Sequence, residues 1–505
     1  MKQLIRKFLI LSGYCLAVTT TFSQSEDIAA KYAELITEEG LRDKLTILAS
    51  DALEGRMTGT RGQKMAAAFI EYHFREIGLK GPVNGSFLQE VPLTQITPGQ
   101  TYILADNERL ENFRDFFFPG ILKTDGVQSA PLVFAGKGTD EEISQLNISN
   151  KAVLLLLPDL KIETVFSSGK VIKSLKEKGA LEVILAPEGN DQEFDRVNAS
   201  MKEWFGHGAL VLQGKIPGGL NAFVVRPSVA EKLLRTSYGK LKDAASKNQI
   251  KKVRENRLTW SGSFDSKEIK SENVLGFLEG SDKKDELIVV TAHFDHIGKN
   301  NEGPDKVNNG ADDDGSGTSA VMQLAEAFME AKKNGNGPRR SILFMTVTGE
   351  EEGLFGSEWY VTHPVFPMGE NVVNLNIDMI GRTDPNHMGD RNYVYAIGSD
   401  KLSDELHRLH EQMNATYTKL SLDYTYNDQN HPEQLYYRSD HWNFAKNNIP
   451  IIFYFDGIHE DYHKPSDEVG KIEFDILKKR TQLVFFTAWA IANQENRIQN
   501  NGSGK

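Results

Sequence analysis

The chain has 505 residues, which corresponds to two to four domains at the usual ~100–200 residues per domain. Hydrophobic residues make up 39% of it and charged residues 25%, a composition that excludes a disordered, collagen-like or coiled-coil protein. With 70 Asp and Glu against 58 Lys and Arg, the net charge of -12 disfavours binding to nucleic acid. Because Cys15 is the only cysteine, any metal site must use His, Asp and Glu.

Residues 1–23 have the features of a secretory signal peptide. Basic residues precede an apolar run from Phe8 to Val18, which is far shorter than the ~20 residues of a membrane span. The small residue Ser23 marks the expected cleavage site, and Tyr14 disfavours a lipid anchor on Cys15. We therefore expect an exported protein, periplasmic or secreted, without a membrane span.

Helical patterns follow the signal peptide. Residues 27–50 and 62–77 have apolar side chains at helical spacing, and the turn Leu53–Gly59 (LEGRMTG) lies between them. Residues 128–261 form a separate pattern, in which short apolar strands alternate with helical stretches such as Val171–Lys178. No motif with recognisable chemistry occurs in this second part.

A second α/β pattern begins near residue 273. Its apolar β-runs are residues 287–292, 341–347, 372–380 and 450–455, and helical patterns such as Thr318–Lys333 separate them. This alternation predicts an α/β sheet with a mostly parallel centre, in which ligands bind beyond the carboxyl ends of the strands. His293, Glu350 and Glu351 lie just past such runs, so we expect the polar chemistry at one edge of the sheet.

Several acidic motifs point to a metal in this part of the chain. The carboxylates of GADDDGSG (310–317) repel one another unless a cation lies among them, although a solvated turn or a calcium loop is an alternative. Asp378 lies in the apolar context LNIDMIG, where a buried carboxylate requires a metal or a salt bridge. His293 and Asp295 point to one face if the strand continues, and the alternative is a surface pair.

Residues 459–463 match the letters H-E-x-x-H of the helical zinc proteases. That motif requires a helix, and Gly457, Pro465 and the preceding strand run disfavour one here. The chain also lacks G-x-S-x-G, which disfavours a serine hydrolase with a nucleophile elbow.

In order and spacing, these motifs resemble the secreted zinc aminopeptidase family, metallopeptidase family 28. RSDH (438–441) and Y-H-x-P-x-D (462–467) complete the resemblance, which covers roughly residues 270–490. This family includes bacterial leucyl aminopeptidases and is related to glutamate carboxypeptidase. The resemblance implies an α/β fold, a three-layer zinc-exopeptidase-like mixed sheet flanked by helices.

The resemblance also implies a domain organisation. The LEGRMTG turn is similar to the start of family members that carry an inserted protease-associated domain, and residues 125–262 would be that insert. Residues 24–124 would be the N-terminal part of the peptidase domain, residues 263–495 the catalytic zinc peptidase domain and residues 496–505 a polar tail.

The resemblance assigns roles to particular residues. Five of them would bind two Zn²⁺ per chain: Asp313 as the bridge, His293 and Asp378 at one ion, and Glu351 and His463 at the other. Asp295 would orient His293, and Glu350 would be the general base. Tyr462 would hydrogen-bond the developing oxyanion.

The implied reaction is hydrolysis of the N-terminal peptide bond through a metal-bridging water, on peptides with a free N-terminus. A carboxyl-end peptidase or dipeptidase remains an alternative, with Arg438 or Arg382 in its specificity pocket. Less favoured alternatives are glutaminyl cyclase, which uses a single zinc, and a binding protein that has lost catalysis.

Overall fold

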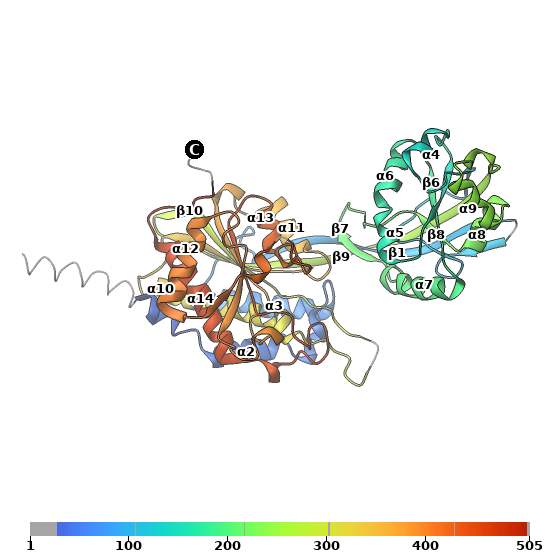
Figure 1. Ribbon diagram of the computed structural model, residues 1–505. Coiled ribbons are helices and arrows are strands. Elements are labelled where there is room, and N and C mark those ends of the chain that lie inside the picture. The colour runs from blue at the N-terminus through green and yellow to red at the C-terminus, as the bar shows by residue number, and fades with distance from the viewer. Residues whose placement is uncertain (1–27, 107, 217, 301–302, 429, 502–505) are drawn as a thin grey trace, which may run out of the picture. The chain divides into compact units, whose positions relative to one another are not determined.

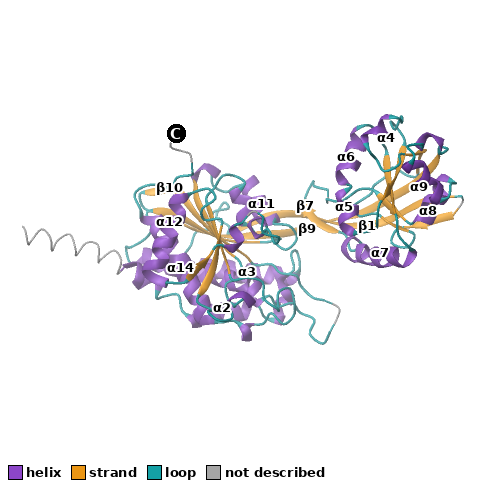
Figure 2. Ribbon diagram, in the orientation of Figure 1, coloured by secondary structure: helices purple, strands orange, loops and turns teal. Residues whose placement is uncertain are grey.

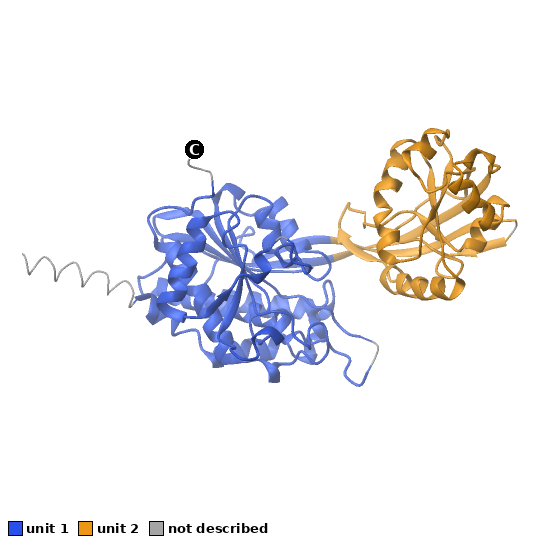
Figure 3. Cartoon of the chain, in the orientation of Figure 1, with its two compact units in different colours: residues 1–92, 270–505 blue, residues 93–269 orange. Residues whose placement is uncertain are grey.

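The computed structural model describes residues 28–501 except 107, 217, 301–302 and 429, so the predicted signal peptide lies outside the described residues. The chain divides into two compact units (Figure 3). Unit 1 comprises Met1–Pro92 and Lys270–Lys505, and unit 2 comprises Leu93–Ile269. Across the described part of the chain, no helix is long and apolar enough to cross a membrane.

Unit 1 is built on a mixed sheet with the strand order β14-β13-β15-β12-β10-β11-β9 (Figure 1). The strands are β9 (Asn256–Leu278), β10 (Lys283–His293), β11 (Arg340–Val347), β12 (Asn371–Ile377), β13 (Tyr393–Ile397), β14 (Ser421–Asp423) and β15 (Ile451–Phe455). In the centre β10 runs parallel to β11 and β12, and β12 runs parallel to β15. This parallel centre confirms the prediction from the apolar runs, but the run 372–380 stops being a strand at Ile377, so Asp378 follows the strand.

Helices cover both faces of this sheet (Figure 2). The helices are α2 (Glu38–Leu48), α3 (Arg61–Ile77), α10 (Gly317–Lys333), α11 (Phe355–Thr362), α12 (Asp404–Met413), α13 (His441–Ala445) and α14 (Phe474–Asn493). Along β10, Ile288 and Val290 pack into the core with α2, α3, α10 and α14, whereas Val289 packs into a second core with α11 and α13. The alternation of side chains in a strand thus produces the predicted three layers.

The helix predicted over residues 27–50 is interrupted. Residues 28–33 are helical, and α2 begins only at Glu38. Thr37 is its N-cap, because the hydroxyl of Thr37 accepts a hydrogen bond from the amide of Gly40 at 3.0 Å. The helix predicted over residues 62–77 is confirmed as α3, which ends at Gly78 in the left-handed conformation.

Unit 2 has a parallel row of strands, β4-β5-β6-β8, flanked by β3. It contains residues 93–105 of β1 (Leu88–Ala105), residues 256–269 of β9, and the strands β2 (Glu108–Glu111), β3 (Phe116–Phe117), β4 (Gln128–Phe134), β5 (Ala152–Leu157), β6 (Glu182–Pro187), β7 (Ala209–Leu212) and β8 (Phe223–Val225). Its helices are α4 (Asp140–Ser144), α5 (Ile162–Ser167), α6 (Gly169–Glu177), α7 (Asp191–Phe205), α8 (Pro227–Leu234) and α9 (Tyr238–Ser246). The unit contains the predicted insert, residues 125–262, together with the flanking residues 93–124 and 263–269.

A buried histidine in unit 1 makes its stability depend on pH. His410 of α12 is fully buried with its ring edge-on to Tyr454, and burial lowers the pKa of His410 to about 3. The unfolded chain takes up this proton near pH 6.5, so the histidine's contribution is complete above that pH and is lost as the pH falls towards 3. From pH 7 to pH 5 we expect this one group to cost about 2 kcal/mol of unfolding free energy.

The measurement is urea unfolding at pH 7 and pH 5 for the wild type, His410→Leu and the exposed-site control His207→Gln. His410→Leu should lose about 2 kcal/mol less than the wild type on acidification, and the control should match the wild type. Equal acid sensitivity of all three proteins would show that His410 does not titrate between the folded and unfolded states.

Candidate metal centre

The parallel strands of unit 1 bring the predicted metal ligands to one edge of the sheet. His293 is the last residue of β10, and Asp378 directly follows β12. Glu351 lies in the turn after β11. Asp313 lies just before α10, and His463 is in the loop after β15. Parallel strands present their carboxyl ends together, so residues far apart in the chain meet here.

Asp313 lies between the two histidines. Its Oδ1 is 3.1 Å from His293 Nε2, and its Oδ2 is 3.1 Å from His463 Nε2. Asp378 Oδ1 is 3.5 Å from His293 Nε2, and Glu351 Oε2 is 3.1 Å from His463 Nε2. Both imidazoles therefore contact Asp313, and each also contacts a second carboxylate, Asp378 for His293 and Glu351 for His463. This arrangement fits two cations joined by one carboxylate. Carboxylate oxygen and imidazole nitrogen are ligands that Zn²⁺ accepts.

The electrostatics of the cluster favour positive charge within it. Burial raises the pKa of Glu350 well above its usual range, and the carboxylates of Asp378 and Glu351 add to that effect. Burial opposes protonation of His463, but hydrogen bonds with Asp313 and Glu351 outweigh it and raise the pKa of His463 to about 10. Carboxylates this close together are stabilised in their ionised form by a cation among them.

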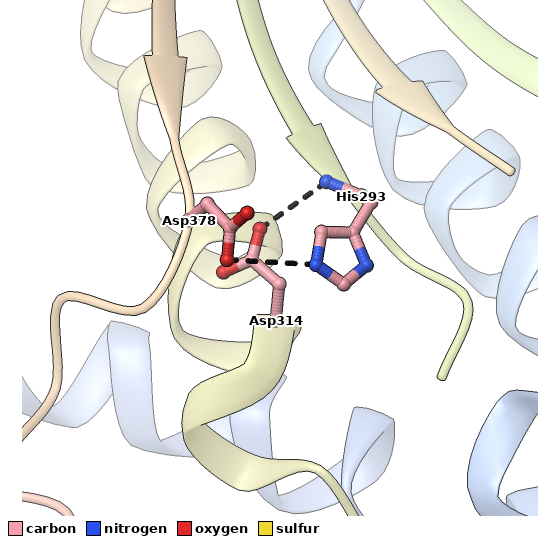
Figure 4. A group of neighbouring side chains, drawn as sticks. All are labelled: His293, Asp314 and Asp378. Atoms are coloured by element: carbon pink, nitrogen blue, oxygen red, sulfur yellow. Dashed lines mark hydrogen bonds and ion pairs between the residues drawn. The ribbon is translucent and has the colours of Figure 1, made fainter. Parts of the chain in front are cut away.

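Asp314 is close to His293 and Asp378 and completes a possible three-ligand group with them (Figure 4). Its oxygens, however, already accept backbone hydrogen bonds. Oδ2 accepts from the amide of His293 at 3.2 Å, and Oδ1 accepts from the amides of Met379 at 3.1 Å and Gly317 at 2.8 Å. Asp314 therefore ties the ends of β10 and β12 to the start of α10, and Asp313 is left to face both histidines.

Two further motif residues hold the predicted ligands in place. Asp467 accepts hydrogen bonds from the amides of Asp312 and Asp313, the latter at 3.1 Å. Ser439 donates to Asp378 Oδ2 at 2.7 Å. The sequence contained both residues in the motifs Y-H-x-P-x-D and RSDH, but it did not reveal what they contact.

Sequence reasoning missed His296, which is buried with its Nδ1 2.8 Å from Glu351 Oε1. His296, Asp313 and Glu351 form a second group that could hold a metal ion. The available signal was its position three residues after His293, in HFDH. His296 and His463 contact different oxygens of the Glu351 carboxylate, Oε1 and Oε2 respectively.

Residues 459–463 are not helical, as their flanking residues predict. His459 Nε2 lies 3.2 Å from Asp312 Oδ2, whereas His463 contacts Asp313 and Glu351. The two histidines of H-E-x-x-H thus contact different carboxylates and do not form the zinc pair of a helical protease. Tyr462 lines the cavity beside the cluster, with its ring stacked on His463 at 3.8 Å between centroids.

The contact between Asp295 and His293 differs from the expected one. His293 Nδ1 is 3.0 Å from the backbone carbonyl oxygen of Asp295, while the carboxylate oxygen Oδ1 is 3.9 Å away. The carboxylate instead accepts hydrogen bonds from the hydroxyl of Thr58 at 2.8 Å and the amide of Glu350 at 3.3 Å. The backbone carbonyl of Asp295 therefore orients the His293 ring. The Asp295 carboxylate is hydrogen-bonded to the two segments that contain Thr58 and Glu350.

Part of the chain is similar to known peptidases. Residues 273–488 match the model of Peptidase family M28. A probable leucine aminopeptidase from Arthroderma benhamiae is 30% identical over 217 residues, which cover 42% of this chain and 55% of that protein. Aminopeptidase YwaD from Bacillus subtilis is 31% identical over 113 residues, or 22% of each protein. The chain spans about half the length of the first of these relatives.

Solved structures share the fold over nearly the whole chain. An aminopeptidase from Aneurinibacillus sp. strain AM-1 has a TM-score of 0.54 at 16% identity, with 93% of this chain and 97% of that one covered. The zinc aminopeptidase BSAP from Bacillus subtilis has a TM-score of 0.50 at 19% identity, with 92% and 98% covered. The resemblance inferred from the motifs is confirmed for residues 273–488, which match Peptidase family M28.

Proposed function

We propose that this protein is a zinc-dependent aminopeptidase that hydrolyses the N-terminal peptide bond of peptides. The observation that carries the proposal is Asp313, which lines one cavity together with His293 and whose two oxygens each lie 3.1 Å from a different histidine nitrogen, those of His293 and His463. The relatives and structural neighbours named as aminopeptidases support the same conclusion.

The residues present fit two zinc ions per chain. Asp313 would contact both ions, with His293 and Asp378 at one, and Glu351 and His463 at the other. When bound, zinc lowers the pKa of a coordinated water and polarises the peptide carbonyl. Asp314 and Asp467 keep this arrangement rigid through backbone hydrogen bonds.

Glu350 is the proposed general base. It lines the same cavity as the metal ligands, and its Oε2 is 4.0 Å from His293 Nε2. Its carboxylate accepts the proton of the attacking water and delivers it to the departing amine, so that one group serves both proton transfers. Tyr462, on the same cavity, is the proposed hydrogen-bond donor to the oxyanion.

The cavity also suggests which end of the substrate it accepts. Apolar side chains line it beside the acidic cluster, namely Met379, Leu435, Phe453, Phe455 and Ile458. An apolar pocket next to buried carboxylates suits a peptide whose first side chain is apolar and whose free ammonium group faces the acidic residues. Arg438 lines the cavity as well and is the observation that favours the carboxyl-end alternative.

Zinc analysis and a matched set of leucyl peptides test the proposal. The set is a free peptide, its N-acetylated form and its C-terminally amidated form. We expect about two zinc ions per chain, and cleavage of the free peptide about 100-fold faster than of the acetylated one, since the latter loses a charge interaction worth about 2–5 kcal/mol. Amidation should change the rate less than about threefold.

Other outcomes identify the alternatives. Loss of cleavage on amidation, with indifference to acetylation, would indicate a carboxyl-end peptidase that uses Arg438. One zinc per chain with cyclisation of N-terminal glutamine would indicate a glutaminyl cyclase. Zinc binding without any turnover would indicate a protein that only binds.

A further inference from the structure

The turn Leu53–Gly59 lies against the metal-binding loops of unit 1, although it precedes them by more than two hundred residues in the chain. Arg56, at the centre of this turn, is 1% exposed. Its guanidinium donates to four backbone carbonyls, those of Phe294 (2.8 Å), Leu48 (2.6 Å), Asn309 (2.7 Å) and Gly310 (2.9 Å). Phe294 follows His293, and Gly310 opens the acidic segment, so Arg56 fixes the turn to both.

The backbone of the turn is joined to the same loops. The amide of His296 donates to the carbonyl of Arg56 at 3.3 Å, and the amide of Gly298 donates to that of Gly55 at 2.9 Å. Gly55 has φ +69, and a Cβ there would lie 2.4 Å from the carbonyl oxygen of Gly298. Only glycine permits so close an approach in this conformation.

Thr58 uses this placement to contact two segments of the site. Its side chain is buried, and its hydroxyl donates to Asp295 Oδ2 at 2.8 Å. The hydroxyl oxygen of Thr58 also accepts a hydrogen bond from the amide of Gly349 at 3.1 Å. A hydroxyl has one proton to donate and lone pairs to accept with, so both contacts form at once.

These contacts close a ring of hydrogen bonds behind the site. Asp295 Oδ1 accepts from the amide of Glu350 at 3.3 Å, and the backbone carbonyl of Asp295 lies 3.0 Å from His293 Nδ1. Thr58 thus links Asp295, whose backbone carbonyl orients His293, to the amide of Gly349, and Asp295 itself accepts from the next amide, that of Glu350. A hydrogen bond from a hydroxyl to a buried carboxylate is among the stronger kinds in proteins.

We propose that Thr58 is a positioning residue for this site: its hydroxyl holds Asp295 and the start of the Glu350 turn in one geometry, while Arg56 anchors the turn that carries it. Thr58 contacts neither proposed metal ligands nor substrate directly and acts through Asp295 and Gly349. The inference rests on the zinc binding of the proposed function, and its kinetic part rests in addition on the proposed peptide hydrolysis.

The test compares Thr58→Val with Thr58→Ser. Valine keeps the branched shape and removes the hydroxyl, and serine keeps the hydroxyl and removes the methyl group. For Thr58→Val we expect a 10–100-fold loss of zinc affinity in competition with a chelator, the usual effect of removing a partner behind a metal ligand. At saturating zinc its kcat should fall 10–100-fold with KM changed less than threefold. Thr58→Ser should stay within about threefold of the wild type in all three quantities.

Two results would overturn the inference. Wild-type zinc affinity in Thr58→Val would show that the hydroxyl positions nothing, and equal losses in Val and Ser variants would assign the effect to packing of the methyl group. If Thr58→Val does not fold, as judged by circular dichroism, Thr58→Ala replaces it in the same comparison. If the wild type binds zinc but cleaves no peptide, the proposed function fails, and the zinc affinities still decide the role of Thr58.

Discussion

Glu350→Gln is expected to lower kcat by about 10²–10⁴-fold while zinc remains bound at the wild-type stoichiometry. Glutamine has the shape of glutamate but cannot take the proton of the attacking water. Glu350 lines the cavity, and its side chain is 10% exposed. Peptide hydrolysis under saturating substrate, together with metal analysis of the same preparation, measures both parts.

Glu352→Gln is the matched control, because Glu352 belongs to the same acidic turn but is not among the residues that line the cavity. We expect it to retain activity within about threefold. A Glu350→Gln enzyme with more than a tenth of the wild-type kcat would assign the proton transfer to another group. Loss of zinc from that variant would instead place Glu350 among the ligands.

The predicted sheet of unit 1 is correct because buried parallel strands have nearly continuous apolar sequences. The runs before His293 and Glu350 stand out from their polar surroundings for this reason. The end of β12 is different, because the apolar run continues through Met379 and Ile380 after the strand has stopped. There Met379 has φ +56 and donates its amide to Asp314, a contact that no local pattern predicts.

The site shows the same division between local and long-range information. Each motif contains its chemistry within a few residues, so the candidate ligands could be named from the sequence. The choice between Asp313 and Asp314 depended on the family resemblance, since adjacent carboxylates have identical chemistry. Thr58 could not be predicted, because its partner Asp295 lies 237 residues away and the hydrogen bond exists only in the folded chain.

Asp313→Asn is expected to reduce zinc to one ion per chain or fewer and to abolish peptide hydrolysis. Asn keeps the size of the side chain but removes its charge and leaves a single oxygen, so the side chain can no longer face His293 and His463 with an oxygen each. The loss of kcat/KM should exceed the about 10–100-fold that follows removal of a partner behind a ligand. Metal analysis after dialysis against a fixed zinc concentration measures the first effect.

Asp314→Asn tests whether the metal ligand is Asp313 or the neighbouring Asp314. Asp314 accepts backbone hydrogen bonds from His293, Met379 and Gly317. Replacing one of its oxygens with an amide nitrogen removes an acceptor, and we expect a loss of about 1–3 kcal/mol of unfolding free energy in the zinc-free protein. The folded variant should still bind two zinc ions. If Asp314→Asn loses zinc while Asp313→Asn keeps it, the metal assignment must pass to Asp314, because only a ligand couples its charge directly to metal content.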